Sequence, residues 1–174
     1  MFKIETDRLI ITEFTPDMAQ AVHKNSLDED NRRFVPDEVF ETVEDAAETI
    51  EFLTSRYGGC EGPLVYPLLL KDKTNIGYVQ AVPLGGCVWE IGYHVGAGYT
   101  GQGYATEAVK AFLPVIMKEL GLTQMAGICL ADNVASQKVM EKCGFVLEFK
   151  GIDGYQGEQR EICRYRYERR AGKE

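Results

Sequence analysis

The spacing of hydrophobic positions along the first part of the chain alternates between strand-like and helical periods. A run rich in β-branched residues predicts a strand at 9–14, and a capping threonine with a proline predicts a short helix that ends near Asn25. The polar stretch 28–37 predicts a loop. Apolar residues at helical spacing then predict an amphipathic helix over 43–57, which two glycines end.

The middle and the end of the chain predict a sheet of mixed direction. Strand patterns at 65–71, 75–83 and 88–95 are separated by short turn sequences, which predicts an antiparallel meander. Further elements follow, as a helix from Ala105 to Leu120, a strand at 122–130, a helix at 134–142 and closing strands at 146–150 and 161–167. This order indicates an α/β (mixed α+β) fold. The sequence has no repeat or composition break, so we expect a single domain over residues 1–174.

A glycine-rich turn, residues 99–108, lies between the last strand of the meander and the following helix. Gly101 and Gly103 carry no Cβ, so backbone N–H groups can approach a ligand closely there. The N–H groups of the first helical turn have no partner within the helix, and the helix dipole favours negative charge at that end. The turn therefore predicts a phosphate site.

Two other phosphate motifs fit this turn less well. Residues 96–101 match G-x-G-x-x-G, but a dinucleotide site needs an opening βαβ unit and an acidic residue about 20 positions on. The first carboxylate that ends the next strand is Asp132, 31 positions beyond Gly101. A P-loop needs Gly-Lys-Ser/Thr, which the sequence lacks. A tight loop without a ligand stays open as an alternative.

Composition narrows the class of protein. With 27 acidic and 19 basic residues the net charge is −8, which disfavours nucleic acid as a partner and mildly favours cationic partners. The sequence has neither an apolar run long enough for a membrane nor a signal-peptide pattern, so we expect a cytoplasmic protein with no membrane partner, either a monomer or a homodimer. The sequence contains no cluster of histidines and carboxylates, so we expect no metal site. Five cysteines without a C-x-x-C pair predict buried free thiols, at Cys60, Cys87, Cys129, Cys143 and Cys163.

Three segments carry a family resemblance. Residues 101–108, preceded by 89–95, resemble the acetyl-coenzyme A motif of the GNAT acetyltransferase superfamily. Residues 133–145 resemble the Asn-x-x-Ser…Glu-Lys-x-Gly-Phe motif of the ribosomal-protein-alanine N-acetyltransferase branch, and residues 5–9 match its acidic-Thr-x-Arg-Leu opening. The resemblance implies a central, mostly antiparallel sheet of about six or seven strands, with helices on both faces and a splayed parallel pair. Thr100 departs from the pattern, which usually has glutamine or arginine there.

The resemblance also implies an activity. Acetyl-coenzyme A (acetyl-CoA) would give its acetyl group directly, in a ternary complex, to a primary amine of a protein N-terminus or a small molecule. Its pyrophosphate would bind backbone amides, and its pantetheine arm would pair with the preceding strand. The implied coenzyme contacts are Tyr93, His94, Val95, Gly101, Gln102, Gly103, Tyr104, Ala105, Thr106, Asn133 and Ser136. A non-catalytic acyl-CoA sensor stays open as the alternative.

Glu90 is the candidate general base, acting through a water, because the branch often carries Glu-Ile-Gly-Tyr at this position. An exposed strand carboxylate without a catalytic role is equally compatible with the pattern. Asp153 and Glu158, expected in a loop at 151–159, are weaker candidates.

Ser136 is the candidate acid, because Met140 stands where many members of the superfamily have a tyrosine. Ser136 could instead bond a backbone carbonyl, and Asn133 is also a good N-cap. For His94, packing is favoured over catalysis. The resemblance implies that residues 25–41 and 151–159 select the acceptor. Acidic residues there, such as Asp28 and Glu38, either attract a cation or are simply solvated.

Overall fold

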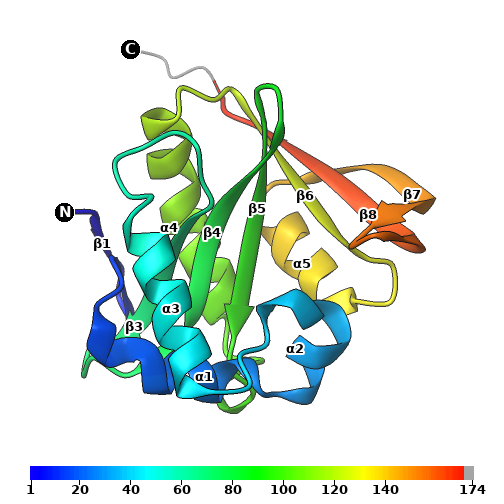
Figure 1. Ribbon diagram of the computed structural model, residues 1–174. Coiled ribbons are helices and arrows are strands. Elements are labelled where there is room, and N and C mark those ends of the chain that lie inside the picture. Colours follow the sequence, from blue (N-terminus) through cyan, green and yellow to red (C-terminus); the bar gives the residue numbers. More distant parts are fainter. Residues whose placement is uncertain (171–174) are drawn as a thin grey trace.

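The computed structural model describes residues 1–170, whose strands form one sheet (Figure 1). The strands lie in the order β1-β2-β3-β4-β5-β6-β8-β7, and β5–β6 is the single parallel pair among the described strands. Their bounds are β1 Lys3–Glu5, β2 Leu9–Thr12, β3 Leu64–Leu70, β4 Asn75–Gly85, β5 Val88–Val95, β6 Gln124–Leu130, β7 Val146–Tyr155 and β8 Glu158–Glu168. The predicted mixed, mostly antiparallel sheet is confirmed, with β1 as an additional strand.

Helices cover both faces of this sheet (Figure 1). They are α1 Ala19–Ser26, α2 Glu29–Phe34, α3 Val43–Thr54, α4 Tyr104–Glu119 and α5 Val134–Lys142. On one face, α1 and α3 bury a small cluster that includes Ile50 and Val65. On the other, α4 packs Phe112 and Ile116 into the main core, where Met140 of α5 is also buried. No helix in the described part is long and apolar enough to cross a membrane.

Three sequence expectations need correction. Part of the predicted loop 28–37 is the helix α2, whose N-cap Asp28 accepts a hydrogen bond from the backbone N–H of Asn31. The predicted loop 151–159 consists of the ends of β7 and β8 around a tight turn, with left-handed backbone at Gln156 and Gly157. All five cysteines are free, but Cys60 and Cys87 are exposed, since Cys60 follows the end of α3 and Cys87 lies in a hairpin turn.

The parallel pair opens toward the C-terminal end of β5. Glu90↔Ala126 is the one register pair between β5 and β6. The N–H of Gly96, the residue after β5, donates to the carbonyl of Ile76 in β4 at 2.8 Å. Because successive residues of a strand turn their backbone groups to opposite sides, those of Tyr93 and Val95 face the open side toward β6. The splayed parallel pair is therefore present.

Candidate active site

The glycine-rich turn joins β5 to α4 through a short 3₁₀ turn, Ala97–Tyr99. Gly101 (φ 74°) and Gly103 (φ 83°) both adopt the left-handed conformation that side chains disfavour. Gly103 is the N-cap of α4 and has no side chain to accept from the first turn. The backbone N–H groups of Tyr104 to Thr106 are therefore available to an anion.

The N-terminal motif holds this turn in place. Nη1 of Arg8 donates to the carbonyl of Gln102 at 2.8 Å, and its Nε donates to Oε2 of Glu107 at 2.6 Å. The same guanidinium lies 4.3 Å from the centre of the Tyr104 ring. Burial raises the pKa of Glu107, but hydrogen bonds from Thr6 and Arg8 outweigh it and hold that pKa below its usual value. Arg8 thus ties residues 5–9 to the glycine turn, a role that the sequence motif had not suggested.

We expect Arg8→Ala to weaken coenzyme A binding about fivefold to tenfold, since two charge-assisted bonds that fix the turn are lost. Calorimetric titration with coenzyme A measures this. Arg166→Ala is the matched control, because Arg166 is similarly half-exposed and pairs with Glu148 on β7. Equal effects of the two substitutions would contradict a role of Arg8 in holding the turn.

A cavity of about 440 Å³ lies at the opening between β5 and β6. Its walls come from the segment after α2, from the three strands β4 to β6, from α5 and from the β7–β8 turn. Four predicted site residues line it together, namely Glu90, Tyr93, Asn133 and Ser136. Val95, the last residue of β5, and the turn 101–106 lie outside its lining. The cavity therefore joins the candidate base to the candidate acid.

Glu90 faces this cavity, while its neighbours Trp89 and Ile91 are buried in the main core. Burial, followed by the nearby charge of Glu38, raises the pKa of Glu90 to about 7, against a lowering contact with the Ile128 backbone. A carboxyl with a pKa near neutrality can accept a proton at physiological pH and release it again. This environment suits a general base better than it suits a solvated strand residue.

Glu38 is a second carboxylate in the cavity wall, at the end of the 3₁₀ turn Pro36–Glu38. Its Oε1 accepts from Nε2 of Gln80 at 3.0 Å, while its buried Oε2 has no partner among the described residues. Burial raises the pKa of Glu38 to about 7, although the bond from Gln80 lowers it. Sequence reasoning treated Glu38 as one of several loop carboxylates, because the strands that surround it are distant along the chain.

Ser136 meets Tyr93 across the opening. The Tyr93 hydroxyl lies 2.9 Å from both the carbonyl oxygen and Oγ of Ser136. Ser136 therefore contacts a tyrosine hydroxyl rather than only a helix carbonyl. Asn133 is the N-cap of α5 and accepts from the Ser136 backbone N–H at 3.2 Å. Met140 is buried, with 2% of its surface exposed, so the late-helix tyrosine position is part of the core.

The other candidate site residues form hydrogen bonds or ion pairs with neighbouring elements. Nε2 of His94 is 3.2 Å from Oδ2 of Asp28 and 3.2 Å from the carbonyl oxygen of Asn25, so its side chain ties β5 to the α1–α2 corner. Asp153 and Glu158 pair with arginines on β8 and do not line the cavity. Within residues 1–170, no group of three or more His, Cys, Asp and Glu side chains is placed to hold a metal ion.

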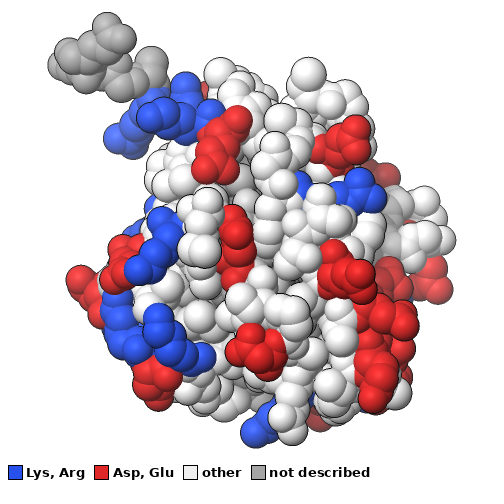
Figure 2. All heavy atoms as spheres, turned by 60° about the vertical axis from the view of Figure 1, so that its left-hand side comes forward, with Lys and Arg blue, Asp and Glu red and all other residues white. Residues whose placement is uncertain are grey.

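The surface charge is mixed. Figure 2 shows Lys and Arg next to Asp and Glu on the face that it displays, without one continuous basic area. This agrees with the acidic net charge of −8.

A splayed parallel strand pair followed by a glycine-rich turn and a helix defines an acyltransferase of the GNAT fold. The chain belongs to this family, since the model of the acetyltransferase (GNAT) domain matches residues 8–146. It is accordingly an N-acetyltransferase.

Individual relatives agree with this assignment. YnaD of Bacillus subtilis (strain 168), described as an uncharacterized N-acetyltransferase, is 33% identical over 143 residues, which are 81% of each chain. A GNAT-family acetyltransferase from Bacillus anthracis has a TM-score of 0.80 at 27% identity, over 96% of this chain and 98% of that one. RimL, a ribosomal L7/L12 N-protein acetyltransferase solved with coenzyme A, also has a TM-score of 0.80, over 96% and 98% of the two chains. Its identity is 16%, so that likeness concerns the fold alone.

Proposed function

We propose that the chain, acting as one domain, transfers the acetyl group of acetyl-CoA directly to a primary amine held beside Glu90. One observation carries the proposal. Glu90, with its pKa raised to about 7, lies in the same cavity as the Tyr93–Ser136 hydroxyl pair, at the place where β5 and β6 separate. A base and a proton donor thus face one opening.

The coenzyme fits along β5 and onto α4. Its pyrophosphate binds the backbone N–H groups of Gly101 to Thr106, where two glycines and a helix N-terminus meet. The amides of its pantetheine arm pair with the free backbone groups of Tyr93 and Val95, as an added strand would. That RimL was solved with coenzyme A supports this choice of acyl carrier.

The reaction needs a neutral amine nitrogen. At pH 7 an α-amino group costs about 1 to 1.4 kcal/mol to deprotonate and a lysine about 4.6 kcal/mol. Ionised Glu90 takes this proton, directly or through a water, and the nitrogen attacks the thioester carbonyl. Backbone N–H groups in the strand opening stabilise the oxyanion. The C–S bond then breaks, and the Tyr93–Ser136 pair relays the second proton of the nitrogen to the thiolate.

Direct transfer, without an acetyl-cysteine intermediate, agrees with the protonation state of the cysteine in the cavity. Cys129 lines the cavity, but burial raises the pKa of its thiol to about 12. A thiol that stays protonated is a poor nucleophile, so an acetyl-cysteine intermediate is disfavoured.

Release of free thiol from acetyl-CoA in the presence of primary amines and short peptides tests the proposal. We expect thiol release that depends on the amine, together with a product heavier by one acetyl group. Tight coenzyme binding without thiol release, for every amine offered, would favour the sensor instead.

A further inference from the structure

We propose that Glu38 is the acceptor-binding carboxylate of this site, and that with Glu90 it selects a compact primary amine that arrives as an ammonium ion. The inference rests on the proposed function and specifies its acceptor. Its basis is the placement of Glu38 in the cavity wall with one oxygen bound and the other without a partner.

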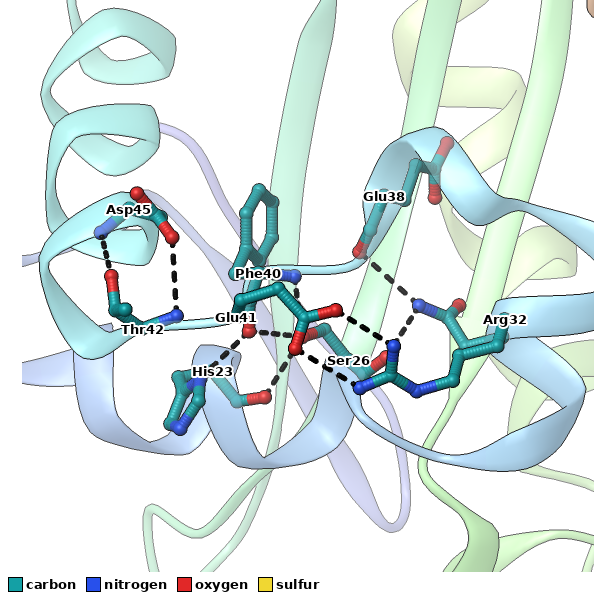
Figure 3. A network of polar contacts seen from close by, with 9 residues as sticks. His23, Ser26, Arg32, Glu38, Phe40, Glu41, Thr42 and Asp45 are labelled. Atoms are coloured by element: carbon teal, nitrogen blue, oxygen red, sulfur yellow. Dashed lines mark hydrogen bonds and ion pairs between the residues drawn. The ribbon is translucent and has the colours of Figure 1, made fainter.

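The backbone that carries Glu38 is fixed on both sides (Figure 3). The side-chain amide of Asn31 donates to the Glu38 carbonyl at 3.1 Å. Nδ1 of His23 lies 2.8 Å from the carbonyl of Phe40, and the Phe40 N–H donates to Oγ of Ser26 at 2.9 Å. Figure 3 shows the Glu38 carboxylate pointing away from this network, toward the strands. The network thus fixes the backbone of Glu38 and forms no bond to its carboxylate.

Gln80 fixes the carboxylate from the sheet side. A Cβ on residue 92 would lie 2.6 Å from Nε2 of Gln80, so glycine at this position leaves room for that side chain to reach Glu38. Gln80 satisfies Oε1 and leaves Oε2 buried. A buried carboxylate oxygen without a donor is costly, and a ligand that brings N–H groups removes the cost.

The charge of the cavity calls for a cation. Among the described residues that line it are three carboxylates, Asp37, Glu38 and Glu90, and no Lys, Arg or His. The other titratable groups that line this cavity or the smaller one beside Glu38 are Tyr78, Tyr93, His94, Cys129 and Tyr155, and His94 is already paired with Asp28. Burial is the main cause that raises the pKa of both Glu38 and Glu90 to about 7, and the charge of Glu38 contributes to the raised pKa of Glu90. An ammonium ion supplies the missing countercharge.

The rim of the cavity favours a compact acceptor. Nε2 of Gln156 donates to the Phe34 carbonyl at 3.1 Å, which joins the β7–β8 turn to α2. Arg33 pairs with Asp132 at 2.6 Å, which joins α2 to the turn before α5. Apolar and aromatic side chains line the space near the carboxylates, including Phe34, Tyr78, Leu84 and Tyr155. The amine therefore carries a small apolar or aromatic body.

The proton balance follows from this arrangement. The ammonium binds both carboxylates and gives one proton to ionised Glu90, which frees the lone pair of nitrogen. The N–C bond forms, the C–S bond breaks, and the nitrogen loses a second proton, which goes to the thiolate. Glu90 then releases its proton to solvent. The product amide is neutral, so the carboxylate pair no longer attracts it, which favours release.

Binding of two probes to the protein, with and without coenzyme A, tests the inference. Phenethylamine is cationic, and phenethyl alcohol is its neutral analogue of similar shape. We expect the amine to bind about 10-fold or more tightly than the alcohol, and Glu38→Gln to remove that advantage while alcohol binding is unchanged. Glu29→Gln, an exposed change of the same charge on α2, is expected to leave both affinities unchanged.

A second readout separates recognition from mere support of the fold. Titration of the Glu carboxyl carbons by NMR is expected to show the pKa of Glu90 falling in Glu38→Gln, since one raising charge is gone. Equal affinities for amine and alcohol, or an unaltered preference in Glu38→Gln, would overturn the inference. A short peptide that displaces phenethylamine at lower concentration would overturn the compact acceptor. These binding assays need no acetyl transfer. A failed binding test would therefore leave the proposed function standing, and a failed transfer assay would leave the binding inference standing.

Discussion

A Glu90→Gln variant is expected to lose about 100-fold in kcat near pH 7, with coenzyme A affinity unchanged. Glutamine keeps the shape of the side chain but cannot take the proton of the amine. The residue lies at the strand opening and does not belong to the glycine turn, so the coenzyme retains its contacts. Steady-state kinetics together with a coenzyme titration measure both quantities.

The pH dependence of kcat/KM is also expected to change in this variant. Wild-type kcat/KM is expected to rise as pH passes through about 7, the pKa to which burial and the charge of Glu38 raise Glu90. Above that pH the base is ionised and the rate levels off. In Glu90→Gln this limb is expected to disappear. Glu158→Gln is the control, because Glu158 pairs with Arg160 outside the cavity. A larger loss in Glu158→Gln than in Glu90→Gln would refute the choice of base.

The free energy of unfolding is expected to fall as pH rises, whereas kcat/KM is expected to rise. Glu90 has a higher pKa in the folded protein than its ordinary value of 4.5, so the folded state binds more protons between about pH 4.5 and 7. The free energy of unfolding of the coenzyme-free protein therefore falls over this window, by up to about 3 kcal/mol for this group. Thermal unfolding of Glu90→Gln is expected to show a flatter pH dependence and no net loss of stability at neutral pH.

Gly103→Val is expected to raise the Kd for coenzyme A by about 30-fold or more. A valine at φ 83° strains the backbone and places its methyl groups beside the first turn of α4, where we propose that the pyrophosphate binds. Gly58→Val is a matched control. Gly58 has φ 80°, and a Cβ there would meet no atom within 4 Å, so it shares the strain without the ligand.

Both valine variants are expected to lose about 1 to 2 kcal/mol in the free energy of unfolding. Only Gly103→Val is expected to lose coenzyme affinity, which calorimetry reports at a temperature where both variants are folded. Similar Kd values for Gly103→Val and wild type would show that the coenzyme phosphates bind elsewhere.

The sequence predicted the elements that carry a strong local period. The meander β3–β5 and the helix α4 were predicted because their buried positions recur at regular spacing. β1 has three residues, too few for a pattern, and α2 is polar, with Asn31 as its one buried residue. The length of the β7–β8 hairpin depends on pairing between exposed residues, which an apolar pattern does not reveal.

The site was predictable to the extent that its residues lie in motifs. Glu90, Asn133 and Ser136 were proposed from the sequence, and the fold brings them to one cavity. Arg8 and Glu38 gain their contacts from segments far away in the chain, at Glu107 and Gln80. The motif at residues 5–9 includes Arg8 but does not give its partner, and no local pattern distinguishes Glu38 from a solvated charge. Both roles therefore required the tertiary structure.

Titration of the isotopically labelled protein with coenzyme A, followed through its backbone amide resonances, tests the central claim most directly. We expect saturable binding, with the largest shifts at the N–H groups of residues 101–106 and further shifts at Tyr93 and Val95. A well-dispersed, folded spectrum in which those resonances stay unchanged up to millimolar coenzyme A would contradict the account.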